Sequence, residues 1–248
     1  MGRGFAGRHH LFLRACAGRS RGGRNVARRP SQVRGAALIT ASIDLRSLLL
    51  PVRQQGRRQS CLAFASSAAH EHGANTGEHL SVEYLFFHTV ALTPGQNPDA
   101  GTTMAATAQA LAQEGQPVEP AWPYSPIQTL PWAPPAFSNP LFKTTMVPGK
   151  PTFADLAATL DKKVPVILGL VITDAFFRPD ALGIIPDEAP DTERGGHAVL
   201  AVGHGLDPAG QEAVLIRNSW GPGWGLDGYA WLSRPYVDRQ LHETASLI

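Results

Sequence analysis

The apolar residues in the first half of the chain follow the spacing of helices. An alanine-rich apolar face after Cys61 predicts a buried helix over residues 61–73. A second helix is expected to open at Ser81, because serine is a favourable N-cap residue. A third helix is predicted over residues 101–111 and is closed by Gly115. This part of the chain is therefore expected to be mainly helical.

The second half contains the short apolar runs that are typical of buried strands. These runs cover residues 164–171, 195–203, 212–218 and 228–232. The second and third runs flank a turn sequence and should pair as a hairpin. Helices first and antiparallel strands second predict an α+β fold with two lobes.

Three further segments connect these elements. Residues 43–53 are expected to form an extended strand that leads into the loop before Cys61. Residues 117–151 hold ten prolines and little periodicity, which predicts an irregular crossing segment between the halves. Thr152 is predicted to cap a short helix that reaches Lys162.

The charges divide the chain into a basic leader, residues 1–43, and an acidic body, residues 44–248. Nine of the 22 basic residues lie in the first 34 positions, and no acid precedes Asp44. The remainder holds 13 basic and 20 acidic residues, a net charge of −7. Within the body, a helical lobe is expected at residues 55–120 and a strand-rich lobe at residues 150–235.

Three interpretations of the leader stay open. It is a disordered leader, a targeting segment, or an arm that binds nucleic acid or docks on the body. The proposed docking site is an acidic run before His197, made of Asp187, Glu188, Asp191 and Glu193.

Composition also bears on compartment and partners. No run approaches the ~18–20 apolar residues of a membrane span, so no membrane association is expected. Cys16 and Cys61 are the only cysteines, which favours a reducing cytoplasm over secretion. We expect a monomer without a metal or other cofactor.

Cys61 is the candidate nucleophile, because a glycine-containing loop delivers it to the start of a predicted helix. A helix N-terminus carries partial positive charge and favours a thiolate. A thiol nucleophile also needs a base, a group that orients the base and donors for an oxyanion. A glutamine, Gln55, lies six residues before Cys61.

His197 is the candidate base among the nine histidines, because it follows two glycines at the start of a predicted strand. His204 lies seven residues further on and would face the opposite side of a regular strand. His70 and the other histidines near Cys61 are expected at the surface or in helix caps.

Asn218 ends the strand that is expected beside His197. Its amide can accept the imidazole N–H and hold one tautomer, and Trp220 is placed to keep water away from that hydrogen bond. Taken singly, each residue has a simpler structural interpretation: a buried cysteine for Cys61, a turn asparagine for Asn218 and a core aromatic for Trp220.

Together these residues resemble the papain family of cysteine peptidases in three motifs. Residues 55–64 (QGRRQSCLAF) are similar to the nucleophile loop of that family, including the spacing from glutamine to cysteine. Residues 196–205 (GHAVLAVGHG) are similar to its histidine strand, and residues 217–225 (RNSWGPGWG) are close to its asparagine motif. The resemblance runs from about residue 44 to residue 231.

The resemblance implies a papain-like two-lobe fold with the active site between the lobes, and thiol-dependent hydrolysis of peptide bonds. Cys61 would be the nucleophile, and His197 the general base and then the general acid. Asn218 would orient His197. The Gln55 side chain and the Cys61 backbone N–H would form the oxyanion hole.

The resemblance also implies how a polypeptide substrate binds. The backbone of Gly101 and Thr102 would hold it in an extended conformation by β-type hydrogen bonds. Met104 and Ala198 would line the pocket for the second residue before the scissile bond, which would favour an apolar side chain there. Gly196 is also assigned to substrate binding.

The chain departs from the family pattern at several positions. Arg58 stands where the secreted members carry a cysteine, Leu62 replaces the usual aromatic after the nucleophile, and Thr102 replaces a second glycine. Arg58 and Leu62 are therefore expected to alter substrate preference or reactivity. On this pattern we expect a trimmed, bacterial-type relative that lacks the disulfides and the long helical propeptide of the family.

Three functions remain in competition. A cysteine peptidase, with endopeptidase activity favoured, is the first. The same acyl-enzyme could transfer its acyl group to an amine, as in peptide ligation. A binding module that has no catalytic activity is the third, although a binder has no need of all four of Cys61, His197, Asn218 and Gln55.

Overall fold

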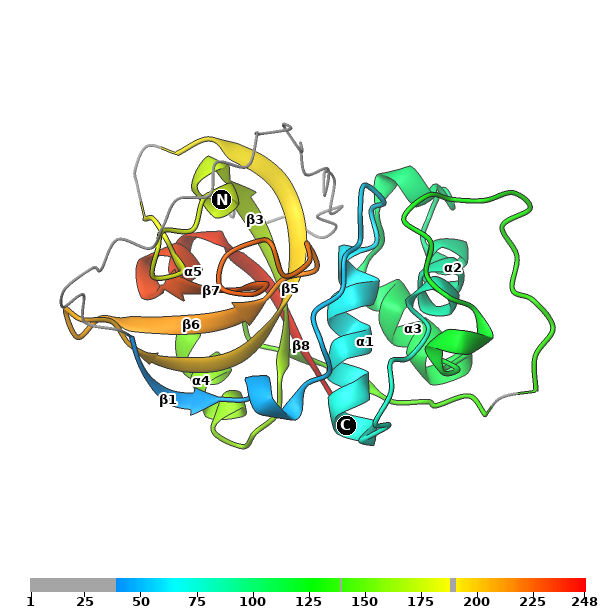
Figure 1. Cartoon of the computed structure of the whole chain (residues 1–248), viewed down its shortest axis with the longest axis horizontal. Coiled ribbons are helices and arrows are strands. Elements are labelled where there is room, and N and C mark those ends of the chain that lie inside the picture. Colours follow the sequence, from blue (N-terminus) through cyan, green and yellow to red (C-terminus); the bar gives the residue numbers. More distant parts are fainter. Residues whose placement is uncertain (1–38, 139, 188–190) are drawn as a thin grey trace, which may run out of the picture.

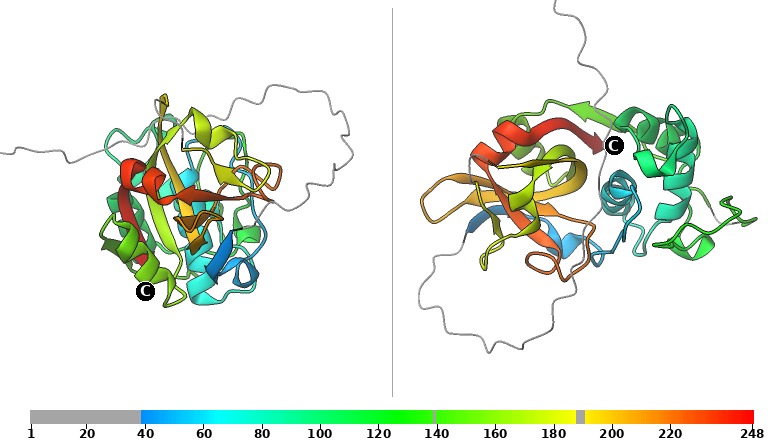
Figure 2. Two further views of the ribbon diagram at one scale, coloured as in Figure 1. Left: turned by 90° about the vertical axis from the view of Figure 1, so that its left-hand side faces the viewer. Right: turned by 90° about the horizontal axis from the view of Figure 1, so that it is seen from above.

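The computed structural model describes residues 39–138, 140–187 and 191–248 of the chain. A strand-rich lobe and a helical lobe lie side by side, with helix α1 (Cys61–Ala74) between them (Figure 1). The right-hand view of Figure 2, from above, shows α1 nearly end-on, with the sheet on one side and two further helices on the other. The predicted α+β fold with two lobes is confirmed. The leader up to residue 38 lies outside the described residues, so its interpretations stay predictions.

The helical lobe consists of α1, α2 (Val82–Leu92) and α3 (Met104–Gln113). As predicted, the Ser81 hydroxyl caps α2 by accepting the Tyr84 N–H at 3.1 Å. The third helix begins at Met104 rather than at residue 101, because Gly101 has a φ of 81° and the Thr103 side chain caps the helix. Residues 101 and 102 therefore lie outside the helix, directly before its cap residue Thr103.

The strand-rich lobe is built on one sheet. Its eight strands within the described residues are β1 (Thr40–Asp44), β2 (Met146–Gly149), β3 (Val166–Thr173), β4 (Ile184–Ile185), β5 (Glu193–Leu206), β6 (Glu212–Arg217), β7 (Tyr229–Ser233) and β8 (Leu241–Leu247). Their order is β2-β8-β3-β5-β6-β7-β4, and β1 pairs with β5. All pairs are antiparallel except β4 with β7.

Strand β5 is the longest, with 14 residues, and it is central to the lobe. Along its first half it pairs with β3, where His197 lies opposite Leu170. Strand β6 pairs with the second half only and ends with Arg217 opposite Leu200. Strand β1 also pairs with the second half, and the backbone carbonyl of Ile43 lies so close to Gly203 that a Cβ there would collide with it.

Several elements differ from the sequence-based prediction. The strand expected over residues 43–53 ends at Asp44 and is followed by a short 3-10 turn (Arg46–Leu48). Helix α4 (Phe153–Leu160) is capped by Thr152 as predicted but ends before Lys162. Helix α5 (Arg234–Gln240) and strands β2, β4 and β8 were not predicted. The strand-rich lobe consequently continues to Leu247, past the predicted limit at residue 235.

Helix α1 joins the two lobes into one core. Eleven of its residues, from Cys61 to Glu71, are buried, and the helix contacts β3, β5 and β8 as well as α2 and α3. Within the described ranges, three further short 3-10 turns complete the elements: Pro98–Ala100, Glu119–Ala121 and Asp174–Phe177. Among the helices of the described residues, none is long and apolar enough to span a bilayer.

Candidate active site

Cys61 is the first residue of α1 and is only 2% exposed. The loop before it is held against the strand-rich lobe, because the Gln55 backbone N–H donates to the Ser219 carbonyl at 2.8 Å. The Gln54 side chain adds a second link by donating to the Trp220 carbonyl at 2.8 Å. The predicted position of the thiol at a helix start is thus what the structure shows.

His197 and Asn218 meet where β5 extends beyond the end of β6. The chain leaves the sheet after Arg217, and the next side chain, Asn218, turns to His197. Asn218 Oδ1 lies 2.8 Å from His197 Nε2 and also accepts the Ser219 N–H at 2.8 Å. Since an amide oxygen only accepts, the hydrogen is on Nε2, which makes Nδ1 the nitrogen for proton exchange in a neutral ring.

A small cavity shows that α1 lies beside Asn218 and beside the strand that carries His197. It has a volume of about 10 Å³ and is lined by Phe64, Ala65 and Ala68 of α1, together with Ala198 and Asn218 from the strand-rich lobe. Its other lining residues are Arg53, Val199, Leu200, Arg217 and Ser219. The fold thus brings together the segments that carry Cys61, His197 and Asn218, although they are far apart in the sequence.

Aromatic rings cover the hydrogen bond between His197 and Asn218. The Trp220 ring lies 4.8 Å from the imidazole between centroids, at an interplanar angle of 33°. Phe177 stacks on Trp220 at 5.2 Å and 18°, and Phe176 meets the imidazole edge-on at 5.6 Å. His197 is fully buried and Asn218 is 3% exposed, so the aromatic cluster shields their bond from water. Phe176 and Phe177 were missed, and an aromatic pair a few residues after a predicted strand was the only signal for them.

The Gln55 side chain has a fixed orientation. Its Oε1 accepts the Ser219 hydroxyl at 2.6 Å, and its Nε2 donates to the Arg58 carbonyl at 2.8 Å. An amide nitrogen carries two hydrogens, so one N–H of Gln55 is used inside the loop and the second can serve a ligand. Ser219 was not predicted as a site residue, and its place between Asn218 and Trp220 was the only hint.

The predicted substrate-binding residues lie in two places. Met104 lines a pocket of about 790 Å³ between α3, β2 and β8, whose lining includes Thr103, Pro148, His242 and Glu243. Ala198 is buried and lines the small cavity instead. Gly101 and Thr102 are buried immediately before α3, and Gly196 lies next to His197 in β5.

The surroundings of three other side chains were not foreseen from the sequence. Leu62, which was expected to alter preference or reactivity, is 1% exposed in the core, and Arg58, of which the same was expected, pairs with Glu83 in the helical lobe. His70 was expected at the surface or in a cap, yet it is 2% exposed and its Nδ1 lies 2.9 Å from Gln116 Oε1. Burial lowers the pKa of His70.

Part of the predicted acidic docking site is already engaged in the body. Asp187 forms an ion pair with Arg239, and Asp191 accepts the backbone N–H groups of Ala175 and Thr192. Glu188 lies outside the described residues. In the described part of the chain, no group of three or more His, Cys, Asp or Glu side chains is arranged to hold a metal ion.

Comparisons with known proteins agree with this geometry. The family model for papain family cysteine proteases matches residues 39–246. Cathepsin L of Sarcophaga peregrina is 26% identical over 246 residues, which cover 91% of this chain and 70% of that protein. The cathepsin L-like peptidase of Aedes aegypti is 28% identical over 202 residues, which cover 79% of this chain. The match spans 59% of the length of the mosquito protein.

Solved structures show the same fold. Xylellain, a cysteine protease from Xylella fastidiosa, is similar with a TM-score of 0.70 and 25% identity, over 84% of this chain and 86% of that one. A cysteine protease of Carica candamarcensis in complex with E-64 has a TM-score of 0.63 and 26% identity, over 84% and 98% of the two chains. The resemblance inferred from the sequence is confirmed: the chain belongs to the papain family of cysteine proteases.

Proposed function

We propose that this protein hydrolyses peptide bonds through a covalent acyl-enzyme on Cys61. The observation that supports this most directly is the buried 2.8 Å contact between His197 Nε2 and Asn218 Oδ1, which fixes the ring for proton transfer at Nδ1. Family membership adds that the substrate is a polypeptide. If the hydrogen bond between His197 and Asn218 served packing alone, the nucleophile loop would not also need the oriented side-chain amide of Gln55.

In the first half-reaction, His197 takes the proton of the Cys61 thiol and the sulfur attacks the carbonyl carbon of the peptide. The negative charge that develops on the carbonyl oxygen is stabilised by the second N–H of Gln55 and by the Cys61 backbone N–H. When the tetrahedral intermediate collapses, the C–N bond breaks and His197 donates its proton to the leaving amine. The acyl group remains on Cys61 as a thioester.

In the second half-reaction, water attacks the thioester and His197 takes a proton from that water. The C–S bond breaks, the carboxylic acid leaves and the thiol is restored with the proton from His197. Asn218 acts throughout by holding the imidazole, since it accepts the same N–H in the neutral and in the charged ring.

We assign substrate binding to the face formed by Gly101, Thr102 and Met104. Residues 101 and 102 precede α3 and are not helical, which suits main-chain pairing with an extended peptide. The pocket beside Met104 is large and mainly apolar, so it is suited to an apolar side chain near the scissile bond. We expect cleavage within chains rather than at their ends.

The pocket assignment is tested with paired peptides that carry leucine or arginine at the second position before the scissile bond. Met104→Glu should lower kcat/KM for the leucine peptide about 10-fold, because an apolar contact of about 1–3 kcal/mol is lost. The arginine peptide should lose less or gain. Equal losses for both peptides would show that Met104 does not line the specificity pocket.

The reaction is tested by profiling cleavage of a diverse peptide library with Cys61→Ala and with the matched control Cys16→Ala. Hydrolysis should be lost in Cys61→Ala and retained in Cys16→Ala, and an alkylating peptide should label only chains that retain Cys61. Cleavage by Cys61→Ala would overturn the proposal. Product analysis with an added amine shows whether water or the amine accepts the acyl group.

A further inference from the structure

The Arg58 side chain turns from the nucleophile loop into the helical lobe and is 9% exposed. Its Nη1 donates to Glu83 Oε2 at 2.6 Å and to the Ser125 carbonyl at 2.8 Å. Glu83 lies in the first turn of α2 and is 2% exposed. A buried ion pair of this kind holds its two segments in one geometry, because separating the charges would leave each of them uncompensated.

Aromatic rings enclose the Arg58 guanidinium. Its central carbon lies over the rings of Phe86, Tyr124 and Trp132, at 5.1, 5.2 and 5.3 Å from their centroids. Nε and Nη2 are buried without a hydrogen-bond partner, so these rings are what surrounds that side of the group. Lysine could not reproduce this arrangement, because it lacks the planar guanidinium.

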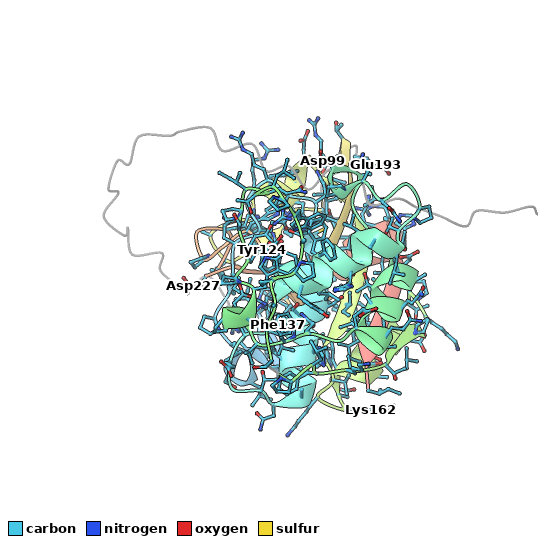
Figure 3. All side chains as sticks on the ribbon, turned by 90° about the vertical axis from the view of Figure 1, so that its right-hand side faces the viewer. Asp99, Tyr124, Phe137, Lys162, Glu193 and Asp227 are labelled. Carbon is cyan, nitrogen blue, oxygen red and sulfur yellow. The ribbon has the colours of Figure 1, made fainter. Side chains whose placement is uncertain are left out.

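Residues of the crossing segment complete the cluster. Trp132 Nε1 donates to Glu83 Oε1 at 2.6 Å, and the Ser125 N–H donates to Glu83 Oε2 at 3.2 Å. Both carboxylate oxygens are therefore occupied. Figure 3, which looks onto the helical lobe, labels Tyr124 and Phe137 in this segment. The nucleophile loop, α2 and the crossing segment are thus held together by one cluster.

The same cluster reaches the oxyanion donor through the backbone. The Arg58 carbonyl is the acceptor of the Gln55 side-chain amide, at 2.8 Å. Tyr124 Oη donates to the Gln55 carbonyl at 2.7 Å and lies 2.8 Å from the Ser60 hydroxyl. Burial raises the pKa of Tyr124 to about 12, so the phenol keeps the proton that it donates.

We propose that Arg58 is a positioning residue for the oxyanion hole. Its side chain, held by Glu83 and the three rings, fixes its own backbone carbonyl, and that carbonyl fixes the direction of the Gln55 amide. This inference rests on the proposed peptidase function. It assigns a task to the position where the sequence departs from the cysteine of the secreted relatives.

The test compares Arg58→Met, Arg58→Lys and Glu83→Gln with the wild-type chain. The matched control is Arg234→Met, because Arg234 also pairs with carboxylates and lies over a ring, that of Phe153 at 5.1 Å, but is exposed in the other lobe. Two rates are measured for each variant: hydrolysis of a peptide, and alkylation of Cys61 by iodoacetamide. Alkylation displaces iodide at a saturated carbon and needs no oxyanion donor.

Arg58→Met should lower kcat between about 10- and 100-fold with little change in KM, since losing an oxyanion donor costs up to about 100- to 1,000-fold. Its alkylation rate should stay within about threefold of the wild-type rate. Arg58→Lys should recover part of kcat, Glu83→Gln should show the same split, and Arg234→Met should change neither rate.

Two results would overturn the proposal. One is a kcat in Arg58→Met within about twofold of wild type, and the other is an equal loss of hydrolysis and alkylation, which would indicate general disruption of the loop. If Arg58→Met does not fold, Glu83→Gln decides by the same comparison. Failure of the wild-type chain to cleave any peptide would instead contradict the proposed function, so the two failures are distinguishable.

Discussion

Replacing Asn218 by alanine would remove one oxygen that serves two buried donors. Asn218 Oδ1 accepts from His197 Nε2 and from the Ser219 backbone N–H, both at 2.8 Å. The two donor residues are 0% and 6% exposed, and Trp220 covers the imidazole. Water therefore has poor access to either donor in Asn218→Ala, and the loss should be visible in both rate and stability.

The effect on rate follows from the difference between a neutral and a charged ring. A hydrogen bond to a neutral donor contributes about 0.5–1.5 kcal/mol, and one to a charged donor about 1.5–3 kcal/mol. Only the difference, about 1–2 kcal/mol, accelerates a step in which the ring carries a proton, and this corresponds to about 5- to 30-fold in kcat/KM. Each orphaned buried donor should further lower the free energy of unfolding by about 1–3 kcal/mol.

The first assay measures kcat/KM per active site, and the active sites are counted by titration with an irreversible thiol-directed peptide inhibitor. The second measures the free energy of unfolding in urea. Counting sites separates a slower enzyme from a smaller folded fraction. The claim that Asn218 stabilises the charged imidazole is refuted if Asn218→Ala keeps kcat/KM within twofold of wild type. It is also refuted if the loss disappears once the rate is divided by the counted number of active sites.

Two further predictions concern stability. Burial lowers the pKa of His70 from its ordinary 6.5, so below about pH 6.5 the unfolded chain binds a proton that the folded chain does not, and stability falls as the pH drops. His70→Gln should make the free energy of unfolding, measured by urea titration at several pH values, fall less steeply with decreasing pH. An unchanged slope would contradict this prediction. Gly203→Ala should cost about 1–3 kcal/mol in urea unfolding, because its Cβ would collide with the Ile43 carbonyl. Gly73→Ala, in α1 with no atom near its Cβ, should instead add about 0.5–1 kcal/mol, and equal effects at the two glycines would rule out the collision as the cause.

The sequence was sufficient for the features that depend on local chemistry. Ser81 and Thr152 cap their helices as expected, because an N-cap needs only a hydroxyl three residues before the N–H that it accepts. The short apolar runs likewise predicted β3, β5, β6 and β7. Asn218 was expected beside His197, because a hairpin turn places the end of one strand near the start of its partner.

The sequence was insufficient where partners are distant and no local period marks them. Strand β8 alternates weakly and becomes a strand by pairing with β2 and β3, whose paired residues lie about 70 or more positions earlier. The pair of Arg58 with Glu83 joins residues 25 positions apart in different elements. Nothing in the neighbourhood of Arg58 distinguishes a buried arginine from a solvent-exposed one.

The cluster around Arg58 has a consequence for redox chemistry. A disulfide would hold a loop only while it stays oxidised, whereas a thiol nucleophile acts only while it stays reduced. A cluster of one ion pair and three aromatic rings contains no disulfide that a reductant could break. Reductant strong enough to keep Cys61 reduced would therefore leave the geometry of its loop untouched.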